Sequence, residues 1–558
     1  MEHSILHTLL STGLILSLGG PITVLCLLLP AARKLGIESD RDPMLCPMME
    51  SVARWVTYGA LAATLGILVN FFVEVAEIQG KTVFGGVDFP LVVRFVTQTT
   101  VGRLSLTHVA LLLLTACAAR LGGTRKWWLV AGLASGSVVV SSLVSHASAQ
   151  PQHRIVAISF QIVHIAAAAI WMGVLLHLFL ARRTMLAKPS SDRISLLAEM
   201  ATKFSPIALA MTSLLGITGL IAAYRYNREL GALFTSPYGL TLLVKLVLLV
   251  PAIFAGFVNF RFIRPKLLEL AQAITRSSRT TSNSKEELDS AKLLCWFVRT
   301  LELEVTAGML VITVAGILGS VSPPGADGSQ RLTAIQTRAL LSPHLPTTDL
   351  SGFDSGPDDP RGPTISDLHF NEFSHNWSGI MVCLIGMAWM AQAVRGSIGS
   401  WAGRVLPFLL LPLGLWVGFG ANPEIWLFHS VSPWQALTDP QLLVHQLSAL
   451  LVFVLVWYAW WDKKNPEERR PFGYPLPTLM IAGSLLLLGH AHSTPFADEL
   501  TNLVNVEHAV LGALALFGGT ARLLVLRGLF PTPLARFVWP SFVIGFGLFM
   551  AFFYRETV

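Results

Sequence analysis

Residues 155–181, IVAISFQIVHIAAAAIWMGVLLHLFLA, decide the fold class of this chain. The stretch contains no Asp, Glu, Lys or Arg. It is longer than the roughly 20 apolar residues that a helix needs to cross a hydrocarbon core of about 30 Å. Its apolar residues are continuous and lack the alternation of a barrel strand. The stretch therefore predicts a transmembrane helix.

Similar apolar runs recur along all 558 residues, 53% of which are hydrophobic and 13% charged. The mean hydropathy of +0.60 lies outside the range of soluble domains. We predict an all-α, polytopic bundle of about 14 transmembrane helices. The first apolar run lacks the basic region and the cleavage site of a signal peptide, so we expect it to remain as a helix. The predicted spans are residues 4–29, 51–74, 104–120, 128–146, 154–181, 203–224, 239–262, 293–320, 375–394, 404–420, 440–461, 474–491, 503–523 and 537–554.

The distribution of basic residues predicts the orientation. Alternate loops, beginning with residues 30–54, hold 29 Lys and Arg, whereas the other loops and the termini hold 10. The positive-inside rule then places both termini outside a bacterial cytoplasmic (inner) membrane. The net charge of +7 is explained by this topology, so membrane lipid and not nucleic acid is the expected partner.

The outer loop around residues 322–373 is rich in Pro, Gly and Asp and predicts a flexible linker. It would divide an eight-helix membrane domain, residues 1–321, from a six-helix domain, residues 374–558. A weak similarity between the two halves suggests an internal repeat. His146 in SHASAQP and His490 in GHAHSTP are each followed eighteen residues later by a second His. The five cysteines show no paired spacing on the outer face, so no disulfide framework is expected.

Histidines gather on one side of this predicted topology. Fourteen of the fifteen fall in outer loops or the outer half of a span, and only His177 lies near the cytoplasm. Imidazole is a common ligand of copper, zinc and iron, and ionisable residues inside a membrane are functional candidates. Each single histidine has an alternative interpretation as a helix cap or headgroup anchor. The predicted metal ligands are His108, His146, His153, His164, His375, His445, His490, His492 and His508.

Spacing adds detail to this prediction. His153 and His164 are eleven residues apart, so a continuous helix would place them on one face. His445 and His508 each lie about five residues inside the outer ends of their spans and hence at similar depth. Glu74 and Glu77 lie at the outer end of the second span, and Glu507 precedes His508.

Sulfur ligands could pass copper from the outer face toward the cytoplasm, since the thioether of Met suits Cu(I). The candidate relay residues are Met172, Met211 and Met309 within the spans and Met44, Cys46 and Met48 in the cytoplasmic segment MLCPMM. Core packing is the competing interpretation for these side chains. Three charged residues, Lys245, Glu302 and Glu304, lie inside predicted spans, where buried charges usually pair. We expect a structural bridge there, with Asn259 or Arg299 as partners.

The middle of the chain, about residues 145–325, resembles the CopD copper-resistance family. SHASAQ is followed by VHIAAAAIWMGVLL with Trp171 and Gly173, and TSPYGLTLLVKLVLLVPAIFAGFVNF contains Tyr238, Gly239, Lys245 and Asn259. RTLELEVTAGMLVITVAGILGSVSPP resembles the closing helix of the family, with Glu304. The resemblance implies copper movement across the cytoplasmic membrane, with a separate periplasmic partner of the CopC type. The last six helices depart from the simple family pattern.

Copper binding and transport, serving uptake, homeostasis or resistance, is therefore the first predicted function. A membrane b-type cytochrome is the alternative: haem b could be held axially by His108 and His164 in one bundle and by His445 and His508 in the other. Delivery of copper to an oxidase is a third. No HExxH, GxSxG or Walker motif occurs, so enzymatic hydrolysis and ATP-driven pumping are not expected, and transport would follow a gradient or the membrane potential.

Overall fold

The structure is a computed structural model of the whole chain. It describes the chain except for residues 1, 38–41, 80–85, 146–152, 187–190, 228, 278–283, 325–330, 352–364, 395–396, 422–431, 433–439, 462–472, 490–497, 530–532 and 557–558.

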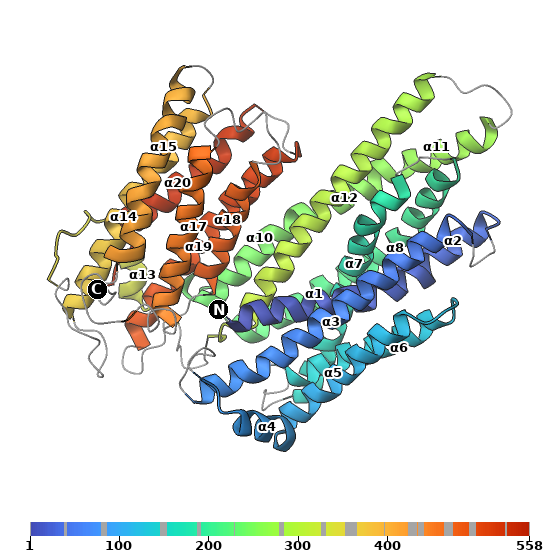
Figure 1. Cartoon of the computed structure of the whole chain (residues 1–558), viewed down its shortest axis with the longest axis horizontal. Helices are drawn as coiled ribbons and strands as arrows, with labels where there is room; N and C mark the ends of the chain where they lie inside the picture. Colours follow the sequence, from blue (N-terminus) through green and yellow to red (C-terminus); the bar gives the residue numbers. More distant parts are fainter. Residues whose placement is uncertain are drawn as a thin grey trace. The chain divides into compact units, whose positions relative to one another are not determined.

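The described residues form helices and no strands, which confirms the predicted all-α class. They divide into two compact units (Figure 1). The N-terminal unit comprises Glu2–Tyr226 with Lys245–Gly319, and the C-terminal unit comprises Asn227–Val244 with Ser320–Val558. The predicted division into residues 1–321 and 374–558 stays a prediction.

The N-terminal unit contains most of the first twelve helices, and α10 contributes to both units. Its helices and π-helical segments (η) are α1 (Glu2–Ile22), η1 (Thr23–Leu28), α2 (Leu29–Lys34), α3 (Leu45–Ile78), α4 (Phe89–Gln98), α5 (Thr100–Ala119), α6 (Lys126–Val144), α7 (Arg154–Leu186), α8 (Ser191–Asn227), α10 (Pro237–Val258), η4 (Asn259–Ile263), α11 (Arg264–Ser277) and α12 (Ser284–Leu318).

Helix α1 lies at the centre of this unit and packs against α3, α6, α7 and α12 (Figure 1). Small residues allow the close approach, as is usual between membrane helices. A Cβ on Gly173 of α7 would lie 2.4 Å from the carbonyl oxygen of Ile15 and 2.6 Å from the Cα of Gly19. Helices α1 and α7 therefore cross with their backbones in contact.

The C-terminal unit contains α9 (Ala232–Thr235), the start of α10, α13 (Ala334–Leu340), α14 (Ile365–Gln392), α15 (Ser397–Leu415), η5 (Trp416–Gly420), α17 (Pro440–Trp461), α18 (Pro475–Leu488), α19 (Asp498–Leu526) and α20 (Ala535–Phe552). Helix α14 packs on α15 and α20, and α19 packs on α18 and α20 (Figure 1). Glycines again permit contact, since a Cβ on Gly547 of α20 would lie 2.6 Å from the backbone nitrogen of Cys383.

Each of the fourteen predicted spans corresponds to a described helix, and twelve helices are long and apolar enough to cross a membrane. The two outside this set are α18, which has 14 residues, and α14, whose first half carries Asp367, Glu372 and Asn376. The boundaries also differ from prediction, because α8 begins at Ser191, twelve residues before the apolar run. Polar turns thus extend helices beyond the membrane-spanning parts.

Residues 331–351 of the predicted linker are described and belong to the C-terminal unit. Helix α13 begins with a capping box in which Thr333 and Gln336 satisfy each other's backbone N–H groups. The backbone N–H of Leu332 donates to Thr235, and that of His344 donates to Phe552. The described part of this loop is therefore bonded at two points to other segments of its own unit.

Candidate functional site

Three predicted histidines meet in the C-terminal unit: His375 of α14, His445 of α17 and His508 of α19. The ring centroid of His375 lies 6.4 Å from that of His445 and 5.9 Å from that of His508. His508 is 3% exposed, so this cluster lies inside the helix bundle. We call these three residues the histidine cluster. The structure thus brings together imidazoles that the sequence places 133 residues apart, from His375 to His508.

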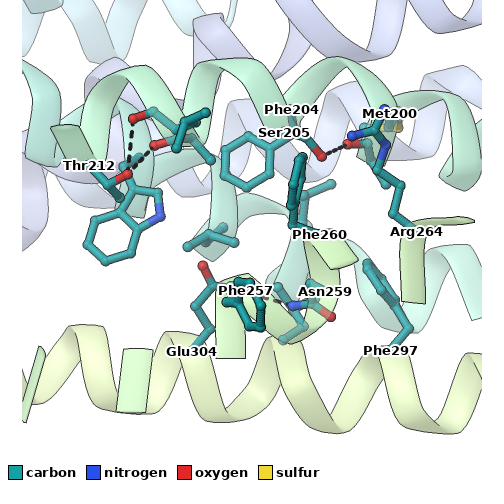
Figure 2. A pocket seen from close by; sticks show the side chains of 18 of the residues that line it. Met200, Phe204, Ser205, Thr212, Phe257, Asn259, Phe260, Arg264, Phe297 and Glu304 are labelled. Atoms are coloured by element: carbon teal, nitrogen blue, oxygen red, sulfur yellow. Dashed lines mark hydrogen bonds between the residues drawn. The ribbon is translucent and has the colours of Figure 1, made fainter. Parts of the chain in front are cut away.

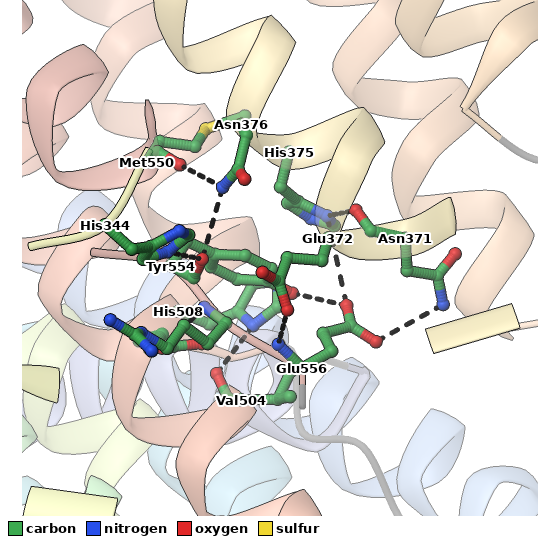
Figure 3. Close-up of polar contacts among 12 residues, drawn as sticks. His344, Asn371, Glu372, His375, Asn376, Val504, His508, Met550, Tyr554 and Glu556 are labelled. Carbon is green, nitrogen blue, oxygen red and sulfur yellow. Dashed lines mark hydrogen bonds and ion pairs between the residues drawn. The ribbon is translucent and has the colours of Figure 1, made fainter. Parts of the chain in front are cut away.

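Hydrogen bonds fix the orientation of two of these rings. The Nδ1–H group of His375 donates to the carbonyl of Asn371 at 2.8 Å, and that of His508 donates to the carbonyl of Val504 at 2.8 Å (Figure 3). Each acceptor lies four residues earlier in the same helix. With Nδ1 as the donor, Nε2 carries the lone pair in the neutral ring. This is the arrangement that orients histidine ligands in metal sites.

The segment after α20 folds back onto the histidine cluster. Tyr554 is fully buried and stacks on His375 with ring centroids 4.1 Å apart. Its hydroxyl donates to Glu556 at 2.7 Å, and Glu556 lies 3.9 Å from Nδ1 of His375 (Figure 3). We call residues 554–556 the C-terminal clamp. It adds a phenol and a carboxylate to the three imidazoles.

Side chains from several helices hold the C-terminal clamp in place. Glu507 accepts from the backbone N–H of Arg555 at 3.0 Å, and Glu372 accepts from that of Glu556 at 3.1 Å. Asn376 donates to the carbonyl of Tyr554, which also contacts His344 (Figure 3). Hydrogen bonds from the clamp backbone to side chains of α14 and α19 therefore hold this segment in a defined position.

Buried acids surround the histidine cluster. Glu372, Glu507 and Glu556 are all buried. Burial raises the pKa of Glu556 to about 7 and holds that of Tyr554 well above its usual range. One oxygen of Glu507 has no hydrogen-bond partner among the described residues. Even so, no group of three or more His, Cys, Asp or Glu in the described part of the chain is arranged to hold a metal ion.

The other predicted metal ligands are dispersed or lie outside the described residues. His146, His490 and His492 belong to the undescribed segments. His153 precedes α7, is exposed and has a φ of 55°, so the continuous helix expected through His153 and His164 begins one residue too late. A left-handed residue at this point turns the chain into the helix, and the two rings do not share a helical face.

His108 and His164, the first predicted haem pair, have separate environments. His164 of α7 hydrogen-bonds through Nδ1 to the Thr218 hydroxyl of α8 at 2.8 Å. His108 of α5 is 3% exposed, and its Nε2 has no hydrogen-bond partner among the described residues. The second pair, His445 and His508, lies in the histidine cluster together with His375. Both haem pairs stay predictions.

The predicted relay residues pack into the core of the N-terminal unit. Met172 and Met48 are buried there, and Met44, Met211 and Met309 lie against the same core. Met172 contacts Gly308 of α12, because a Cβ on that glycine would meet its sulfur at 2.3 Å. Cys46 is half-buried and unbridged. Their positions are compatible with packing, and a conducting role stays a prediction.

Glu304 pairs within the N-terminal unit, as expected of a buried charge. Its carboxylate accepts from the Asn259 amide at 3.2 Å and from the Trp171 indole. Asn259 in turn accepts from the Thr300 hydroxyl. Figure 2 shows Glu304 and Asn259 at the edge of a cavity between α8 and α12. Glu302 and Lys245 are both half-buried.

Sequence reasoning missed the C-terminal clamp, Glu372 and a contact at the start of α1. There, His3 bonds to Glu77 at 2.8 Å and to Asn70 at 3.1 Å. The available signals were weak: Glu372 precedes His375 by three residues, and Tyr554 and Glu556 directly follow the last apolar run. Neither pattern identifies a partner without the fold.

Comparisons with known proteins match the N-terminal part of the chain. Residues 4–153 match the copper resistance protein D-like N-terminal domain, and residues 198–318 match copper resistance protein D. Copper transport protein CutJ of Bacillus subtilis (strain 168) is 27% identical over 190 residues, which cover 34% of this chain and 30% of that relative. No solved structure matches the chain. Residues 4–153 and 198–318 of this membrane protein thus match two domain models of the copper resistance protein D type, as the resemblance in its sequence predicted.

Proposed function

We propose that this protein binds copper at the outer face of the bacterial cytoplasmic membrane and moves it across that membrane. The family domains support a copper-related membrane function. The relative CutJ is named a copper transport protein, although the chain spans only 30% of its length. To this copper-related function the proposal adds the copper-binding site, the side of the membrane from which copper arrives and the transport step.

The observation that carries the proposal is the meeting of His375, His445 and His508. Imidazole nitrogens suit copper in either common oxidation state. The ring centroids lie 5.9 and 6.4 Å apart, but in the described part of the chain the rings are not arranged to hold a metal ion as they stand. Copper binding would require these side chains to rotate until their Nε2 atoms meet at a shared point, and the neighbouring carboxylates would balance the charge of the ion.

The remaining parts of the proposal follow from the topology predicted by charge. Both termini would face outward, which places the histidine cluster on the side where a separate CopC-type protein could deliver copper. Met172, Met211 and Met309 would offer soft ligands inward, and Met44, Cys46 and Met48 would receive Cu(I) at the cytoplasmic side. Residues 322–373 would connect the two membrane domains.

The proposal is tested by metal analysis of the purified full-length protein. Wild type, loaded with copper and desalted, should retain copper in stoichiometric amounts. The triple variant His375→Ala, His445→Ala, His508→Ala should lose at least one equivalent. His369→Ala is the matched control, because His369 lies on the same helix but pairs with Asp349. Equal copper in all three proteins would refute the histidine cluster as the site.

Haem binding is distinguished in the same sample. Bis-histidine haem gives a strong Soret band, whereas a copper site does not. A Soret band at one equivalent per chain, lost in the triple variant, would replace the transport proposal with electron transfer.

A further inference from the structure

A cavity of about 250 Å³ lies in the N-terminal unit between α7, α8, η4 and α12. Its walls are mostly apolar and include Leu175, Phe204, Phe257 and Leu301. It is smaller than the roughly 300–1,000 Å³ of pockets that enclose whole drug-sized ligands. It therefore suits one apolar part of a larger molecule.

Several wall residues also face outward, toward the hydrocarbon of the membrane. Leu209 is 65% exposed, Phe257 54% and Ile253 50%. Only 6% of the most apolar stretch of α8 is buried by the rest of the protein. A chain in the surrounding lipid can thus reach the cavity from the side.

The two ends of the cavity differ in polarity. Glu304 and Thr212 lie toward one end, and Arg264 lies toward the other (Figure 2). At the first end, Asn259 and Trp171 already donate to Glu304, and Thr212 donates to backbone carbonyls. The polar groups of this end are satisfied by the protein, so a ligand needs no polar atom there.

The Arg264 end carries positive charge. Among the described residues that line the cavity, Arg264 is the only base and Glu304 the only acid. The Arg264 guanidinium lies 5.5 Å from the centre of the Phe260 ring, at the point where the apolar run of α10 and η4 ends. Basic residues that directly follow an apolar run lie at headgroup depth and attract anionic lipid.

We propose that this cavity is a binding site for an anionic phospholipid. One acyl chain enters the cavity between α8 and α12, and the phosphate pairs with Arg264, whose planar guanidinium suits phosphate oxygens. The proposal depends on the N-terminal unit alone and not on copper binding. It gives Phe204, Phe257 and Phe260 a role as walls for a lipid chain.

Native mass spectrometry of the full-length protein tests the site. After delipidation and addition of dioleoyl phosphatidylglycerol or dioleoyl phosphatidylcholine, wild type should retain one phosphatidylglycerol in preference to phosphatidylcholine. Arg264→Gln should weaken phosphatidylglycerol retention about fivefold, the effect of about one basic residue near a lipid headgroup. Ala208→Phe, which fills the cavity, should reduce retention of both lipids.

Arg261→Gln is the matched control, because Arg261 lies in η4, three residues before Arg264, but does not line the cavity. Equal losses in the Arg261 and Arg264 variants would overturn the phosphate contact and indicate general attraction of lipid to a basic surface. Equal retention of phosphatidylglycerol and phosphatidylcholine by wild type would also overturn the phosphate contact. Undiminished retention by the Ala208 variant would overturn the acyl-chain site.

A second measurement uses the unmodified protein and does not depend on the folding of any variant. Phosphatidylglycerol that carries a diazirine in one acyl chain is photolysed in the complex, and the labelled peptides are mapped. Labels on residues 200–212 or 253–260 support the proposal. Labels confined to residues that do not line the cavity refute it.

Discussion

Asn259 shows how one amide can hold a carboxyl group inside an apolar bundle. It is the first residue of the π-helical segment η4, donates to Glu304 and accepts from Thr300. π-Helical turns inside α-helices often occur at functional sites. Because the partners come from η4 and α12, this contact ties two helices of the copper resistance protein D match together.

Asn259→Leu should destabilise the protein by about 1–3 kcal/mol, because Glu304 loses a donor in a buried position. Thermal unfolding of the detergent-solubilised protein would measure the loss. In a Glu304→Leu background the same substitution should cost much less, since no carboxylate remains unsatisfied. Additive losses in the double variant would show that the two residues do not act together.

Glu556 makes the C-terminal clamp sensitive to pH. Its pKa is raised from 4.5 to about 7 by burial, so the docked clamp binds a proton that the released clamp gives up above pH 4.5. Docking is therefore strongest below pH 4.5 and weakens as pH rises toward 7. Between pH 5 and pH 8, opening of the clamp should increase on the order of a hundredfold.

Hydrogen exchange of residues 550–556, corrected for intrinsic rates, would measure this opening. Glu556→Gln removes the titrating group and keeps its shape, so the pH dependence should vanish. A pH dependence that persists in Glu556→Gln would assign the effect to another group, such as Glu507, which accepts from the Arg555 backbone N–H.

At the scale of helices, the sequence predicted well which membrane helices exist and poorly where each helix begins and ends. Apolar runs marked each membrane helix because lipid exposure demands continuous apolar residues. They did not mark α13, which depends on the capping pair Thr333 and Gln336, or the polar first half of α14. Those parts are stabilised by contacts within the fold, and no hydrophobic pattern in the sequence predicts them.

The crossing of α1 and α7 gives a direct test of helix packing. Gly173→Val should lower the free energy of unfolding by about 3 kcal/mol or more, because the added carbons overlap the backbone of Ile15 and Gly19. Gly216→Val in α8 has open space around its Cβ and serves as the control for helix propensity. Similar unfolding temperatures for both variants would contradict the close crossing.

For the whole molecule, the family resemblance and the all-α class were predictable because they depend on composition and ordered motifs. The site was predictable only in part. His375, His445 and His508 were among nine candidate ligands, but depth along a helix does not reveal which helices adjoin. The packing of α14 on α20 and of α19 on α20 supplied that information.

The predicted orientation can be tested on the intact chain. Alkaline phosphatase fused after residue 558 should be active, because the C-terminus is expected outside the cytoplasm, and a fluorescent protein at that position should be dark. Reporters inserted at residues 278–283 should behave in the opposite way. The same reporter response at both positions would contradict the proposed topology.

The C-terminal clamp also sets an order of assembly during synthesis. Helices α14, α17 and α19 leave the ribosome before the residues that follow α20, so their imidazoles enter the bilayer without Tyr554 and Glu556. Until that stretch is translated, the buried acids Glu372 and Glu507 lack the backbone N–H groups that they bind in the finished protein. Nascent chains stalled after α20 would consequently hold an open, incompletely bonded pocket, which closes only when residues 554–556 have left the ribosome.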